Sequence, residues 1–168
     1  MASIVAGLRQ KGITWTDFEG RVRPLERRDI LVVAPYNAQV AALARRVGED
    51  AHVGTVDRFQ GQQAPVVIYS MTSSSAQDAP RGMSFLYNPN RLNVATSRAR
   101  CACILVAAPR LLEPECGSPE QMLWANGLCR YRELAKEVAL PGPSAEPSPA
   151  PAPDGGKDRR GGQMELGF

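Results

Sequence analysis

Three apolar runs, separated by segments with helical spacing, constrain the fold of this chain most strongly. The runs are Ile30–Ala34, Val66–Met71 and Cys101–Ala107. A continuously apolar strand is typical of a parallel sheet that is covered on both faces. Because strand and helix patterns alternate at short intervals, the sequence predicts an α/β fold with a parallel sheet and right-handed crossovers.

The composition changes sharply along the chain and suggests three parts. Residues 1–28 are expected to form an N-terminal helix and a connector, 29–138 the main domain, and 139–168 a disordered tail rich in proline and glycine. The expected elements are helices over Ser3–Lys11, Asn37–Val47, Asn90–Arg100 and Pro119–Val138, a short strand over Val53–Val56, an irregular connector over Ile13–Arg28 and an exposed loop over Thr72–Gly82.

The segment Asn90–Arg100, NRLNVATSRAR, carries three arginines. Arg91 and Arg98 are seven residues apart, so on a continuous helix both side chains would point the same way, while Arg100 would point to the opposite face. Guanidinium groups held by a helix on a sheet can bind phosphate oxygens. An ordinary solvated basic helix face is the alternative.

Three segments follow one another in a specific order: ILVVAPYNAQV (30–40), VGTVDRFQGQQAPVVIYS (53–70) and NRLNVATSRAR (90–100). Together they resemble motifs IV, V and VI of superfamily 1 helicases, in the branch of the nonsense-mediated-decay helicase and the replication nuclease-helicases. The resemblance spans roughly residues 29–112, and weaker similarity continues to about residue 137. It implies a RecA-like fold of the P-loop NTPase type, and it identifies this part of the chain as the second motor domain.

The resemblance implies nucleotide contacts in motifs IV and VI. Arg98, which follows Ser97 in motif VI, takes the place of the arginine finger that stabilises charge on the γ-phosphate. Arg91 is either a phosphate neighbour or a brace for the motif V loop. Tyr36 in motif IV would stack on adenine, or else cap the core, and Gln39 would form a hydrogen bond in the same site.

Motif V implies contacts to both nucleotide and nucleic acid. Gln60 and Gly61 match its turn, where glycine lets the backbone approach a phosphate closely. Thr55 would contact the backbone of a single strand, although a core threonine is the alternative. Gln63 stands where many relatives have a glutamate; its amide can still bind a ribose hydroxyl but provides no fixed charge. Val40 stands where some relatives have a basic residue, so one γ-phosphate contact is lost.

The sequence contains no G-x-x-x-x-G-K-[ST] segment and no acidic pair after an apolar strand. In this superfamily the first motor domain carries both features, so ATP with magnesium would be held mainly by a domain that this sequence lacks. We therefore expect the C-terminal motor domain of an ATP-dependent DNA or RNA helicase, inactive alone. Its expected partners are single-stranded DNA or RNA and an N-terminal helicase domain or chain.

Two other functions are compatible with the sequence. One is a non-catalytic module on a helicase scaffold that binds nucleic acid or docks a partner. The other, an unrelated nucleotide-binding α/β protein, would need a glycine-rich loop after the first strand, where this chain has Ala34-Pro35-Tyr36.

Composition restricts the remaining classes. A formal net charge of +3 does not by itself indicate nucleic acid. The sequence has no run of eighteen apolar residues, so we expect no membrane partner and a cytoplasmic location. The four cysteines, at 101, 103, 116 and 129, lack zinc spacing and are expected to be buried free thiols, and His52 has no partner ligands nearby. No metal site is expected.

Overall fold

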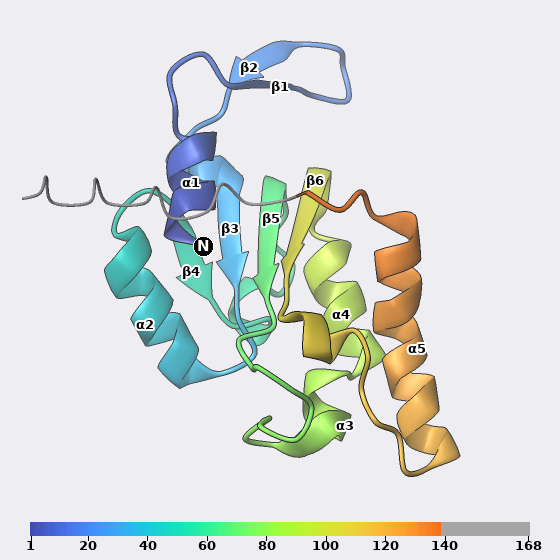
Figure 1. Ribbon diagram of the computed structural model, residues 1–168. Helices are drawn as coiled ribbons and strands as arrows, with labels where there is room; N and C mark the ends of the chain where they lie inside the picture. The colour runs from blue at the N-terminus through green and yellow to red at the C-terminus, as the bar shows by residue number, and fades with distance from the viewer. Residues whose placement is uncertain (139–168) are drawn as a thin grey trace, which may run out of the picture. The chain divides into compact units, whose positions relative to one another are not determined.

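The computed structural model describes residues 1–138 (Figure 1). Its centre is a four-stranded parallel sheet in the order β4-β3-β5-β6. The strands are β3 (Ile30–Val33), β4 (His52–Gly54), β5 (Ala64–Ser70) and β6 (Ala99–Val106). The predicted parallel α/β sheet is confirmed.

The two faces of the sheet explain why its central strands are continuously apolar. Leu31, Val33, Val67 and Tyr69 belong to one core, which also contains residues of α3 (Gly82–Leu86), α4 (Pro89–Thr96) and α5 (Pro119–Leu134). The alternate strand residues, Ile30, Val32, Val66 and Ile68, belong to a second core with residues of α1 (Ala2–Leu8) and α2 (Asn37–Val47). Because helices cover both faces, no strand position needs a polar residue.

The predicted loop over Thr72–Gly82 contains no helix or strand up to Arg81, and α3 begins at its last residue. Two local predictions were wrong. The expected connector contains an antiparallel hairpin, β1 (Thr14–Thr16) paired with β2 (Val22–Pro24). The arginine helix ends at Thr96, with Ser97 as its C-cap, and β6 begins at Ala99. Helix α2 has the predicted bounds. The predicted tail, 139–168, lies outside the described residues.

The hairpin lies beyond the end of the sheet at which the parallel strands begin (Figure 1). We call this end the amino edge and the opposite end the carboxyl edge. Short 3-10 turns connect the layers: η1 (Arg27–Asp29) leads into β3, η2 (Asp57–Phe59) follows β4, and η3 (Pro109–Leu111) follows β6. Within the described residues no helix is long and apolar enough to cross a membrane.

Candidate nucleotide and nucleic-acid site

The predicted site residues lie at both edges of the sheet. Tyr36 and Thr55 follow the carboxyl ends of β3 and β4, whereas Gln63 and Arg98 directly precede β5 and β6. At the amino edge the backbone N–H of Ala64 donates to the carbonyl oxygen of Arg98 at 3.0 Å. Motif V therefore crosses from one edge to the other, and Arg91 and Arg98 of motif VI do not lie at one edge. The three motifs therefore do not line a single edge of the sheet.

Arg98 does not share a helix face with Arg91. Helix α4 stops where the backbone N–H of Ser97 donates to Asn93 at 2.8 Å, and the chain must then turn to pair with β5. The Arg98 side chain is half-buried, and its Nε is buried without an acceptor among the described residues. A buried guanidinium donor costs free energy unless something accepts its hydrogen bond. The fold therefore leaves one donor of Arg98 without a partner at the amino edge.

Arg91 belongs to an aromatic cluster near the carboxyl edge. Its guanidinium carbon lies 4.0 Å from the centre of the Phe85 ring, and Phe85 stacks on Tyr36 with ring centres 5.4 Å apart. The Arg91 Nη1 also lies 3.8 Å from a carboxylate oxygen of Asp57, in the η2 turn of motif V. This pairing favours the brace, one of the two roles open for Arg91. Because Phe85 covers one face of Tyr36, only the other face remains for a base.

Two buried hydroxyls lie at the end of β5. Tyr69 is 1% exposed, and its Oη has no partner among the described residues; the same holds for Oγ1 of Thr72. Burial raises the pKa of Tyr69 to about 12, although the charge of Arg91 opposes this shift. Thr72 has a φ of 59°, a conformation that costs free energy for a residue with a branched side chain. The carboxyl edge thus contains two buried hydroxyl groups without a hydrogen-bond partner among the described residues and one strained backbone position, Thr72.

The other motif residues differ in their exposure and in whether they help to form a turn. Oγ1 of Thr55 accepts a hydrogen bond from the backbone N–H of Arg58 at 3.4 Å, so Thr55 helps to form the η2 turn. Gly61 has a φ of 81°, as a tight turn at that position requires. Gln60 is exposed, and Gln39 is half-buried in the first turn of α2. Their predicted ligand contacts remain predictions.

No group of three or more histidine, cysteine or carboxylate side chains within residues 1–138 could hold a metal ion. The cysteines are free, but Cys101 is exposed and the other three are half-buried, so the prediction of buried thiols was wrong. Strand β6 lies at the border of the sheet, and its residues 100–102 are exposed. Burial raises the pKa of Cys103.

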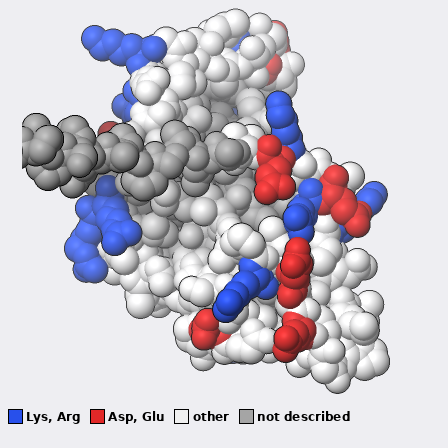
Figure 2. Space-filling model, in the orientation of Figure 1, with Lys and Arg blue, Asp and Glu red and all other residues white. Residues whose placement is uncertain are grey.

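The surface over α5 carries basic and acidic side chains in alternation (Figure 2). Arg130 pairs with Glu133 at 2.9 Å, and Arg132 pairs with Glu113 at 3.6 Å. Charges of both signs side by side produce little net field. This surface therefore does not favour a nucleic-acid backbone, and the two sheet edges remain the better candidates.

Comparison with known proteins decides the family. The family described as "AAA domain" matches residues 4–110, from α1 through motifs IV, V and VI to the start of η3. The chain belongs to the AAA domain family. The matched range includes Arg98, the hairpin and all the predicted site residues.

Relatives of this AAA domain are helicases of the type predicted from the motifs. A regulator of nonsense transcripts 1 homolog from Arabidopsis thaliana is 32% identical over 124 residues, which cover 74% of this chain and 9% of that protein. The DNA polymerase alpha-associated DNA helicase A of Schizosaccharomyces pombe is 40% identical over 85 residues, 48% of this chain and 12% of that protein. The resemblance to superfamily 1 helicases is confirmed, and the chain spans about a tenth of the length of these relatives.

Sequence reasoning missed two features of the site. Phe85 joins Tyr36 to Arg91, but it lies in a segment with no clear helical period, so only the contacts reveal it. The hairpin was missed because its strands are three residues long, too short for alternation to be recognised. The segment Asp17–Gly20, with Gly20 at a φ of 78°, was its one turn signal.

Proposed function

We propose that this AAA domain is the second RecA-like motor domain of an ATP-dependent helicase. The observation that carries the proposal is the position of Arg98. It lies at the amino edge beside Gln63, with a buried Nε and no carboxylate partner among the described residues. Seven other arginines of the described part form ion pairs; they are Arg21, Arg23, Arg27, Arg28, Arg91, Arg130 and Arg132. Several arginines of residues 1–138 form no ion pair either, but only Arg98 among them has a buried Nε without an acceptor, and such a donor is suited to a phosphate oxygen.

In this proposal Arg98 neutralises the negative charge that develops on the γ-phosphate of ATP. Gln63 orients the nucleotide by binding a ribose hydroxyl through its amide. ATP and magnesium are held mainly by a P-loop segment in another domain or chain, because residues 1–138 provide no carboxylate cluster for the metal. The residues of the described part supply charge and orientation to that site.

Single-stranded DNA or RNA would bind at the opposite edge. Thr55 follows β4 there, and the unpartnered hydroxyls of Tyr69 and Thr72 lie at the same edge. Through Asp57 and Arg91, motif V joins motif VI by an ion pair of 3.8 Å. This ion pair connects the motif V turn next to Thr55 with the helix that precedes Arg98.

The test is ATP hydrolysis by this chain mixed with a P-loop-bearing first domain of a related helicase. Arg98→Ala is expected to reduce the turnover rate by about 10³–10⁵, and Arg98→Lys is expected to restore little, because an ammonium cannot reproduce the planar fork. Arg45→Ala on the exposed side of α2 serves as the control. Steady ATP turnover by this chain alone, abolished by Arg98→Ala, would contradict the proposal.

A non-catalytic module that binds single strands is the second candidate. The replacement of a glutamate by Gln63, and of a basic residue by Val40, favours it, since both changes remove charged groups that relatives have in these motifs. This function predicts salt-sensitive binding of a single strand by the chain alone. It also predicts no hydrolysis in the mixture described above, so the same preparation separates the two candidates.

A further inference from the structure

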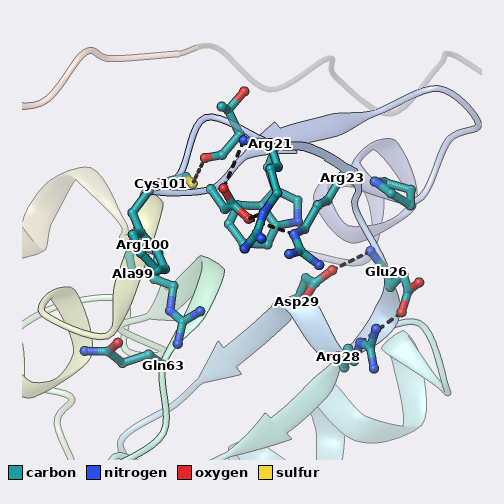
Figure 3. Close-up of a pocket in the computed structure, with 14 residues that line it drawn as sticks. Arg21, Arg23, Glu26, Arg28, Asp29, Gln63, Ala99, Arg100 and Cys101 are labelled. Carbon is teal, nitrogen blue, oxygen red and sulfur yellow. Dashed lines mark hydrogen bonds and ion pairs between the residues drawn. The ribbon is translucent and has the colours of Figure 1, made fainter.

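A pocket of about 800 Å³ lies between the β1–β2 hairpin and the amino edge of the sheet (Figure 3). Four arginines line it: Arg21 and Arg23 from the hairpin, Arg28 from η1 and Arg100 from β6. Gln63, the predicted nucleotide contact of motif V, forms part of the same wall. The volume falls within the range typical of pockets for small ligands, about 300–1,000 Å³.

Asp17 fixes the hairpin arginines in place. Its carboxylate is 5% exposed and accepts hydrogen bonds from Nε of Arg21 at 3.0 Å and from Nε of Arg23 at 2.9 Å. The backbone N–H groups of Glu19 and Arg21 donate to its other oxygen. Burial alone would raise the pKa of Asp17, but these hydrogen bonds outweigh it and hold the pKa well below its usual range. Asp17 therefore stays ionised at neutral pH.

The remaining carboxylates of the pocket are also engaged by the fold. Glu26 and Asp29 form a reciprocal cap around η1, in which each side chain accepts the backbone N–H of the other. Glu26 also forms an ion pair with Nε of Arg28 at 2.9 Å. All three acidic side chains thus have partners, so they oppose an incoming anion less than three free carboxylates would.

The arginines keep donors for a ligand. Arg23 and Arg28 form their ion pairs with Asp17 and Glu26 through Nε, which leaves their Nη nitrogens as further donors. Arg100 is exposed and makes no ion pair with any described residue; in Figure 3 it lies beside Gln63. Guanidinium groups that are oriented through Nε present the Nη pair to a phosphate in a bidentate geometry.

Two aromatic residues line the pocket. Phe18, at the hairpin turn, is 90% exposed, and its ring is free to stack on a base. Trp15 has a buried Nε1 that lacks an acceptor among the described residues. The pocket shares the amino edge with Arg98, whereas Thr55, the predicted contact to a single strand, lies at the other edge.

We propose that the hairpin pocket binds the phosphates of a nucleoside di- or triphosphate through Arg23, Arg28 and Arg100. The choice of a nucleotide over a nucleic-acid strand rests on the proposed function, because that assigns Gln63 and the amino edge to the nucleotide. The binding itself requires neither a first motor domain nor an arginine finger.

The experiment is calorimetric titration of the full 168-residue chain with ADP and, separately, with inorganic pyrophosphate. Arg100→Ala and Arg28→Ala are each expected to weaken binding of both probes by about tenfold or more, as the loss of one charge-assisted hydrogen bond implies. Arg100 is exposed and unpaired, so its removal should leave the fold intact. Arg46→Ala, an exposed arginine on α2, is the matched control and should bind both probes as the wild type does.

No binding of ADP or pyrophosphate by the wild type, or equal binding by Arg100→Ala, would overturn the proposal. A twelve-nucleotide single strand that displaces pyrophosphate at lower concentration than ADP would also overturn it, because the pocket would then serve a nucleic acid. If pyrophosphate binding depends on Arg100 while the mixture with a first domain shows no hydrolysis sensitive to Arg98, the motor proposal fails and the pocket stands.

Discussion

Gly54 ends β4 and immediately precedes the motif V turn, and the structure leaves no room there for a methyl group. A Cβ atom at this position would lie 2.9 Å from Cδ of Arg58 and 2.9 Å from Cε2 of Phe59. The Arg58 side chain is exposed and can move away at small cost. The Phe59 ring is 4% exposed within the core under α4, so it cannot move without disturbing its neighbours.

The expected cost of Gly54→Ala follows from these two contacts. Overpacking of a core typically costs about 1–3 kcal/mol. Alanine also loses less backbone entropy on folding than glycine does, which returns about 0.4–1 kcal/mol. We therefore expect a net loss of about 1–2 kcal/mol in the free energy of unfolding. With a urea dependence of about 2 kcal/mol per molar, the unfolding midpoint should fall by about 0.5–1 M.

The assay is urea unfolding of Gly54→Ala followed by tryptophan fluorescence, with Gly7→Ala as the matched control. Gly7 lies inside α1, and a Cβ there would meet nothing within 4 Å, so alanine should raise stability slightly. The second test combines Gly54→Ala with Phe59→Leu, which removes the colliding ring. The double variant should be more stable than the sum of the single effects predicts, by at least about 0.5 kcal/mol. Additive effects, or a Gly54→Ala variant as stable as the wild type, would refute the steric argument.

Two further predictions concern charged groups. Asp57→Asn should lower the free energy of unfolding by less than about 0.5 kcal/mol, because the carboxylate is 77% exposed. Arg91→Ala also loses its contact with Phe85 and should lower the free energy of unfolding by about 1–2 kcal/mol. Equal losses for the two variants in parallel urea titrations would contradict this. Asp17→Asn should destabilise the chain at neutral pH, and the difference from the wild type should shrink as the pH falls below about 4, since the folded pKa lies below the unfolded value of about 3.9. A difference that is constant from pH 3 to pH 7 would show that Asp17 does not act through its charge.

Local pattern was sufficient where one element could be recognised from its own residues. Helix α2 begins after Tyr36 and ends at Val47, and the next residue, Gly48, has a φ of 62° that suits glycine, so both of its bounds follow from the sequence. The bounds of α4 did not follow, because the pattern of Asn90–Arg100 is compatible with a longer helix. The helix stops at Thr96 only because β6 must begin at Ala99 to pair with Ala64.

For the site residues, too, the sequence predicted the identity of the residues but not their positions in space. Arg98, Arg91 and Tyr36 were selected by their places in ordered motifs, which requires no coordinates. That Arg98 and Arg91 do not lie at one edge depends on the direction of α4 relative to β6, and spacing along the chain contains no such information. The hairpin pocket joins residue 17 to residue 100, and contacts at that separation form only when the sheet has assembled.

The sequence by itself determined that this chain forms a parallel sheet with covered faces and that it carries three helicase motifs in order, because apolar runs and motif spacing are local properties. The tertiary structure alone decided the strand order β4-β3-β5-β6, the placement of Arg98 with Gln63 at the amino edge, and the stacking of Tyr36 on Phe85. These features arise from pairing and packing between distant segments, whose relative free energies depend on the whole core rather than on any one stretch of residues.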